Sequence, residues 1–106
     1  MPIGMLQMMP GGTREHYEQL GEKMFGAPSS QFSADDAPDG LIMHSAGPTP
    51  DGWYVYDIWE SREHLGRFVN ERLMPAAAEL GGPAPSEPQI FEVYNLVHVP
   101  SATTSG

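Results

Sequence analysis

Two short stretches of this chain repeat each other almost letter for letter, and this repeat constrains the fold more than any other feature. They are Thr13-Arg14-Glu15-His16 and Ser61-Arg62-Glu63-His64, which lie 48 residues apart. Threonine and serine are favoured N-cap residues, and a glutamate in the first turn is favourable beside the positive end of the helix dipole. Each stretch therefore predicts the start of a helix.

Apolar runs surround these helix starts in the same order in both halves of the chain. Strands are expected at residues 3–9, 41–47, 53–60 and 89–99, with helices beginning at Thr13 and Ser61. The offset that superposes the helix starts also brings the second strand onto the fourth. The order is βαββαβ, and two βαβ halves of equal period predict a ferredoxin-like α+β fold, an antiparallel sheet with two helices on one face.

Glycine and proline residues mark the expected boundaries of these elements. Gly26 is expected to end the first helix, and Pro75 is expected to kink or split the second. Residues 26–40 form a long loop rich in Gly, Pro, Ser and Asp, predicted to be the most mobile internal segment. Loops of this length are commonly lids, binding loops or disordered segments. Residues 1–99 are expected to form one domain, and residues 100–106 a disordered tail.

The composition argues against several classes of function. Fourteen acidic and five basic residues give a net charge of -9, so neither nucleic acid nor an anionic membrane is expected as a partner. The chain has no cysteine, no histidine pair with ligand spacing and no phosphate-binding loop, so neither a metal site nor a cofactor is expected. The first residues lack the charged and apolar segments of a signal peptide or membrane span, which makes a cytoplasmic protein the expectation.

The strands carry apolar residues on both of their faces. On the third strand, one face has Trp53, Val55 and Trp59, and the other has Tyr54, Tyr56 and Ile58. Helices on one side of the sheet cover only one of these faces. A second copy of the chain is the simplest cover for the other, so a homodimer is expected.

With these features the chain resembles the dimeric α/β-barrel superfamily, which includes the antibiotic-biosynthesis monooxygenases. The stretches that carry the resemblance are PDGLIMHSAGPTPDGW, YDIWES, ERLMPA and EVYN, and it covers residues 3–99. It implies a homodimer whose two sheets close a barrel, with a ligand cavity in each subunit between sheet and helices. Members include cofactor-independent oxygenases acting on polycyclic phenols, haem-degrading enzymes, lactone isomerases, polyketide cyclases and proteins with no demonstrated activity.

His44 is the main candidate for a catalytic residue. It stands in the middle of a predicted strand, where β structure does not call for a histidine. An imidazole there suits a general base or a hydrogen-bond donor to a phenol or enol, and the alternative is a half-buried histidine satisfied by its neighbours. The hairpin register is open by one residue, so His44 lies either opposite Tyr56 or beside Asp57.

Asp57 is the second candidate for a catalytic role. A carboxylate within the apolar run YVYDIW is costly unless it is paired or hydrated. It either orients His44 or pairs with an arginine of the following helix, and the arginine pairing is favoured. The possible arginine partners are Arg62, Arg67 and Arg72.

Four further residues are candidates for ligand binding. Tyr56 and Asn95 are expected as polar anchors, and Trp53 and Trp59 as apolar walls of the pocket. Aromatic residues also favour strands for packing reasons alone, which is the competing interpretation.

Three functions fit this sequence. The first is an enzyme that acts on a small, mostly apolar aromatic or polyketide-like molecule, as a cofactor-independent monooxygenase or as a cyclase or isomerase. The second is a non-catalytic carrier that uses the same cavity. The third is a structural dimer whose interior is filled by methionines and aromatic residues.

Overall fold

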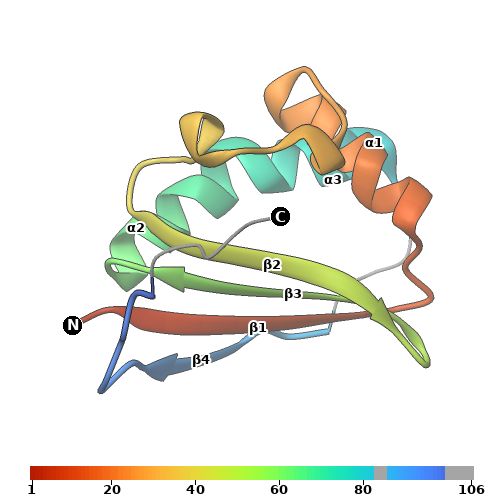
Figure 1. The fold of residues 1–106 in the computed structure, drawn as a ribbon. Coiled ribbons are helices and arrows are strands. Elements are labelled where there is room, and N and C mark those ends of the chain that lie inside the picture. The colour runs from red at the N-terminus through yellow and green to blue at the C-terminus, as the bar shows by residue number, and fades with distance from the viewer. Residues whose placement is uncertain (83–85, 100–106) are drawn as a thin grey trace.

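The four strands form one antiparallel sheet, and all the helices lie over one of its faces (Figure 1). The structure is a computed structural model that describes residues 1–82 and 86–99. The sheet order is β2-β3-β1-β4. The strands are β1 (Ile3–Pro10), β2 (Leu41–Thr49), β3 (Gly52–Trp59) and β4 (Gln89–Glu92). This order and these directions are those of a split βαβ fold, so the predicted ferredoxin-like α+β class is confirmed.

The two repeated stretches begin helices in the same way. At the start of α1 (Arg14–Phe25), the Thr13 hydroxyl accepts a hydrogen bond from the His16 backbone N–H at 3.1 Å. At the start of α2 (Arg62–Phe68), the Ser61 hydroxyl accepts from the His64 N–H at 3.1 Å. The repeat therefore encodes two N-caps that set where each helix leaves the sheet.

The second helix is interrupted just before Pro75. A π-helical turn, η3 (Val69–Leu73), separates α2 from α3 (Met74–Leu80). The Met74 N–H bonds to the carbonyl of Val69, five residues back. Pro75 then lies in the first turn of α3, where the absence of a backbone N–H does least harm. The predicted interruption is thus confirmed, and it takes the form of a change in helical pitch.

The packed core lies at one end of the sheet, under α2. Ile3 and Met5 of β1 pack with Trp59 of β3 and Leu65 of α2. Trp59 has only 1% of its surface exposed and is the most deeply buried large side chain of this group. This cluster fixes α2 on the sheet, and three of its four residues also line a cavity between the helices and the sheet.

The last strand is much shorter than the predicted strand at residues 89–99. β4 ends at Glu92, which pairs with Ile3, and the Val93 N–H makes one further bond to the Pro2 carbonyl. Because β4 runs antiparallel to β1, it passes the beginning of β1 at this point. Residues 94–99 have no neighbouring strand there, and Tyr94 is 95% exposed. The prediction of a strand over all eleven residues was wrong for this reason.

The long loop between α1 and β2 contains two short 3₁₀ turns, η1 (Ser29–Gln31) and η2 (Ala34–Asp36).

None of the helices in residues 1–82 and 86–99 has the length and apolar character needed to cross a membrane. The tail predicted to be disordered, residues 100–106, lies outside the described residues.

Candidate functional site

A cavity of about 680 Å³ lies between the helices and the sheet. Its walls are mostly apolar, with side chains from β1 and β3 below and from α1, α2 and α3 above. Leu20, Phe25 and Phe68 are among these wall residues, and the loop 26–40 adds Phe32 at one side. The volume is within the range of about 300–1,000 Å³ that is usual for pockets holding small organic molecules.

A β-bulge in β2 turns His44 toward this cavity. Leu41 pairs with Trp59, but Met43 pairs with Ile58, so β2 has one extra residue, Ile42, at this point. Side chains of a regular strand alternate between the faces, and three positions separate Leu41 from His44. The extra residue lets both of these side chains face the helices. Beyond the bulge the register is regular, with His44 opposite Asp57, which settles the alternative that the sequence left open.

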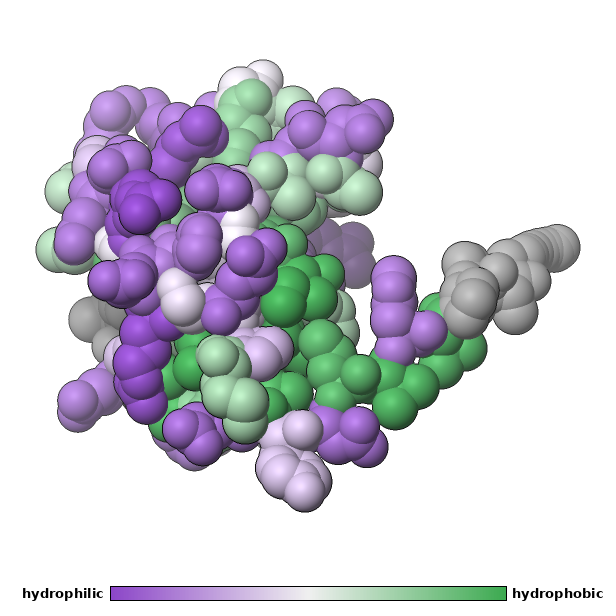
Figure 2. All heavy atoms as spheres, turned by 90° about the vertical axis from the view of Figure 1, so that its left-hand side faces the viewer, coloured by the Kyte–Doolittle hydropathy of each residue, from purple (hydrophilic) through white to green (hydrophobic). Residues whose placement is uncertain are grey.

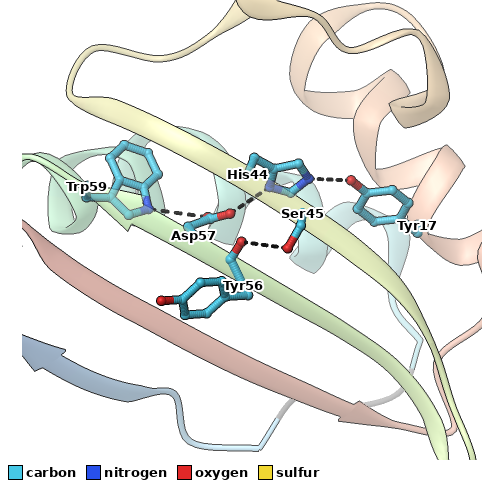
Figure 3. A network of polar contacts seen from close by, with 6 residues as sticks. All are labelled: Tyr17, His44, Ser45, Tyr56, Asp57 and Trp59. Carbon is cyan, nitrogen blue, oxygen red and sulfur yellow. Dashed lines mark hydrogen bonds and ion pairs between the residues drawn. The ribbon is translucent and has the colours of Figure 1, made fainter. Parts of the chain in front are cut away.

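Asp57 is buried on the same face, and both of its oxygens are hydrogen bonded (Figure 3). Only 5% of its surface is exposed. Oδ1 lies 2.7 Å from His44 Nδ1, and Oδ2 accepts from Trp59 Nε1 at 3.2 Å. The favoured pairing with an arginine was wrong, because the sheet directs Asp57 inward, where a histidine and a tryptophan from the same sheet satisfy it. Of those arginines, Arg67 lies by the surface residue Asp39, and Arg72 donates to the Met24 carbonyl.

Tyr17 of α1 approaches His44 from above the sheet and forms a polar group with His44 and Asp57. Its hydroxyl lies 2.5 Å from His44 Nε2 (Figure 3). Its ring packs against that of Trp53 in a tilted arrangement, with the ring centroids 5.4 Å apart. Tyr17 was missed at the level of the sequence, because it was read only as part of the apolar helix face. Its hydroxyl was the feature that could have indicated a polar role. The other residues of that helix face have no hydroxyl or amide group; they are Leu20, Met24 and Phe25.

The loop 26–40 is fixed against this group at its first turn. Ser29 Oγ donates to the Tyr17 carbonyl at 2.6 Å, and Gly21 of α1 lies directly beneath Ser29. A side chain at position 21 would come within 2.6 Å of the Ser29 backbone nitrogen, so only glycine allows this approach. The ring of Phe32 then meets His44 edge-on at 5.5 Å. The loop therefore forms the side wall beside the imidazole, and its predicted mobility stays a prediction.

The hydrogen-bond partners determine where the protons lie. A carboxylate can only accept, so His44 Nδ1 must carry the hydrogen that it gives to Asp57. In a neutral imidazole Nε2 is then the acceptor, and the Tyr17 hydroxyl donates to it. Burial raises the pKa of Tyr17 to about 12, and the negative charges of Asp57 and Glu18 add to this effect. Tyr17 thus keeps its proton, while His44 presents a basic nitrogen whose other side is held by a carboxylate.

The structure brings together only some of the predicted site residues. His44, Asp57 and Trp59 line the cavity, and Trp53 lies behind the ring of Tyr17. Within the described residues, the buried Nε1 of Trp53 has no hydrogen-bond partner.

Two of the predicted polar anchors do not reach the cavity. Tyr56 alternates with Asp57 along β3, so its ring lies on the other face of the sheet, stacked on Phe91 at 6.3 Å. Asn95 lies in the exposed segment that follows β4. Both residues were expected to contact a ligand in this cavity, and this expectation is corrected. Tyr56 points to the opposite face of the sheet, and Asn95 lies beyond the end of β4 at Glu92.

The described residues offer no obvious place for a metal ion. Across residues 1–82 and 86–99, no group of three or more His, Cys, Asp or Glu side chains is arranged to hold one.

Comparison with known proteins finds a likeness in structure alone. No family model matches the sequence, and no curated protein matches it. An antibiotic-biosynthesis-monooxygenase-type protein from Chloroflexus aurantiacus superposes with a TM-score of 0.64 and 13% identity, over 92% of this chain and 98% of that one. SnoaB, a cofactor-independent oxygenase from Streptomyces nogalater, superposes with a TM-score of 0.56 and 16% identity, over 91% of this chain and 95% of that one.

A third solved structure, the Rv0793 protein of Mycobacterium tuberculosis, gives a TM-score of 0.58 at 15% identity, over 92% of this chain and 100% of that one. At such identities the likeness shows the fold and leaves the activity open. The chain therefore has the ferredoxin-like α+β fold that the antibiotic-biosynthesis-monooxygenase-like proteins also have.

Proposed function

We propose that this protein binds a small, mostly apolar aromatic or polyketide-like molecule and removes a proton from its phenolic or enolic hydroxyl. The observation that carries the proposal is the Asp57–His44 pair, which presents a basic imidazole nitrogen to an apolar cavity of about 680 Å³. Large apolar pockets with a few convergent polar groups are the usual sites of small-molecule chemistry. Of the two residues predicted to be catalytic, His44 is the proposed base and Asp57 orients it, and Trp59 is proposed as part of the apolar wall.

The proton transfer uses the two nitrogens of His44 for different tasks. Nε2 accepts the proton from the ligand, and Nδ1 keeps its hydrogen bond to Asp57 at 2.7 Å. The carboxylate stabilises the imidazolium that forms and keeps the ring in one tautomer. Trp59 Nε1 holds the second carboxylate oxygen, so Asp57 is prevented from turning away. Asp57 acts in this scheme through His44 and is a positioning residue.

The anion produced by this step is electron-rich and suits a cofactor-independent monooxygenase, because such an anion can react with oxygen directly. The same fold in SnoaB, a cofactor-independent oxygenase, supports this choice. Ring closure and isomerisation of a polyketide-like substrate also begin with an enolate, so a cyclase or isomerase shares the first step.

The charge of the cavity favours a ligand that enters uncharged. Among the described residues that line it there is no lysine or arginine, while Asp57 and Glu87 contribute carboxyl groups. The chain as a whole has a net charge of -9. An aromatic carboxylate would meet unfavourable electrostatics on approach and on binding, whereas a neutral phenol would not.

A homodimer is part of the same proposal, because the outer face of the sheet is apolar and open. This face carries Leu6, Met8, Met43, Tyr54, Tyr56 and Phe91. Met43 is 37% exposed and Phe91 is 42% exposed. Figure 2 shows apolar side chains continuing from the body of the molecule along the projecting C-terminal segment, where Val97 is 69% exposed. Exposed apolar side chains gathered on one face are typical of a surface that a partner covers.

Light scattering tests the dimer. We expect a mass of about twice 11.6 kDa at micromolar concentration. Phe91→Glu should give the monomer mass, because it places a charge on the apolar outer face. A wild-type protein that stays at 11.6 kDa would contradict the dimer.

Replacing His44 tests the base. A panel of hydroxylated polycyclic aromatic compounds is incubated with the protein in air, while oxygen consumption and product mass are followed. We expect His44→Gln to lower the rate at least about a hundredfold, because a positioned general base contributes about that much. His98→Gln, which changes an exposed histidine of the C-terminal segment, is the matched control. Unchanged turnover in His44→Gln would remove the catalytic role, and a wild type that binds these compounds without changing them would be a carrier.

The protonation of Tyr17 gives a prediction about stability at high pH. The folded protein holds this proton up to pH about 12, whereas the unfolded chain loses it near the ordinary tyrosine pKa of about 10. The unfolded state therefore releases its proton first, and stability falls as pH rises through this window. Urea unfolding of wild type and Tyr17→Phe should show this extra loss in the wild type alone. If the free energy of unfolding falls equally in both proteins between pH 10 and 12, Tyr17 is not held in its neutral form.

A further inference from the structure

The basic nitrogen of His44 is already occupied in the structure, and the group that occupies it is Tyr17. The Tyr17 hydroxyl lies 2.5 Å from Nε2, and both side chains line the cavity. A ligand that gives a proton to His44 must therefore enter between these two groups. This requirement limits the chemistry of the ligand atom that reaches them.

A hydroxyl group satisfies both neighbours at once. Its oxygen can accept the hydrogen bond that Tyr17 now gives to His44, and its hydrogen can be donated to Nε2. A ketone or an ether leaves Nε2 without a donor, and an ammonium group leaves the Tyr17 hydroxyl without an acceptor. Buried polar groups left without partners weaken binding, so this pair of residues selects hydroxyl-bearing ligands.

We propose that Tyr17 is a further catalytic residue, which donates a hydrogen bond to the ligand oxygen and stabilises the oxyanion that forms when His44 removes the proton. This inference rests on the proposed function and names how its site recognises and ionises the ligand. In the step, the ligand O–H bond breaks and the Nε2–H bond forms. The electron pair stays on the ligand oxygen, which continues to accept from the Tyr17 hydroxyl. Nδ1 keeps its hydrogen bond to Asp57 throughout, so atoms and charge balance within the site.

The surroundings of Tyr17 suit a fixed hydrogen-bond donor. Trp53 packs on its ring at 5.4 Å, and Ser29 Oγ holds its backbone carbonyl at 2.6 Å. Its own pKa of about 12 is above that of an ordinary phenol, so the proton stays on Tyr17 when the ligand beside it ionises. A donor that is already oriented in a largely apolar site stabilises a developing negative charge more than one in water does.

The test uses β-naphthol, an uncharged hydroxyl-bearing aromatic whose absorbance changes on ionisation. The pKa of bound β-naphthol is measured by spectral titration with wild type, Tyr17→Phe and Tyr54→Phe. Tyr54 loses the same hydroxyl on the outer face of the sheet and serves as the matched control. Circular dichroism and thermal unfolding confirm that each variant is folded.

We expect Tyr17→Phe to raise the pKa of bound β-naphthol by about one to two units, because a hydrogen bond to a charged group is worth about 1.5–3 kcal/mol and one unit corresponds to about 1.36 kcal/mol. Binding of neutral β-naphthol should change little, because the variant also has no internal Tyr17–His44 bond to break. The control should match the wild type, and the methyl ether of β-naphthol should bind more weakly than β-naphthol to the wild type.

The possible failures are distinguishable. If β-naphthol binds and His44→Gln impairs its ionisation, while Tyr17→Phe leaves the pKa of the bound molecule unchanged, the role of Tyr17 is overturned and the proposed function stands. If the wild type binds neither β-naphthol nor the larger hydroxylated polycyclic compounds, both the inference and the proposed function are overturned.

Discussion

The buried carboxylate of Asp57 imposes the main constraint on this structure, because its two oxygens must find hydrogen-bond donors in a nearly dry environment. Trp59 supplies one donor and His44 the other. Trp59 is also the centre of the packed core beside Ile3 and Leu65. The residue that anchors α2 on the sheet is thus the same residue that fixes Asp57. A change that loosens the core would therefore also disturb the orientation of His44.

A cavity of this size is a considerable demand on a chain of 106 residues. Small domains bury a limited fraction of their surface, so unfilled apolar space reduces the packing that holds them together. The structure meets the two needs with shared residues, because Met5, Trp59 and Leu65 belong to the packed cluster and also line the cavity. Methionines such as Met9 and Met24 line the cavity, and their flexible side chains can adapt to ligands of different shape. Dimerisation through the outer face would add further burial without filling this space.

The helix starts, the order of helices and strands along the chain and the interruption at Pro75 were predictable, because each depends on local sequence features. Thr13 and Ser61 cap their helices through their own side chains, and proline acts through its own missing N–H. The end of β4 was not predictable from its apolar letters, because it depends on where β1 begins in space. Pairing partners in a sheet are a property of the assembled fold.

The site was predictable only in part, for the same kind of reason. His44 and Asp57 stood out as polar residues in apolar strands, but their pairing depends on one extra residue, Ile42, that gives no local signal. Tyr17 was missed because a tyrosine on the apolar face of a helix is normal, and its meaning depends on which strand lies below it. Tyr56 was misplaced because a strand alternates its faces, and only the register shows which face is which.

The tautomer of His44 tests the proposed base most directly. Proton–nitrogen correlation spectra of the histidine side chains distinguish a protonated ring nitrogen from an unprotonated one. At neutral pH, we predict that His44 carries its hydrogen on Nδ1, bonded to Asp57, with Nε2 free to accept from Tyr17 or from a ligand hydroxyl. A His44 ring protonated on Nε2 alone would contradict this, because the nitrogen that faces the cavity could not then act as a base.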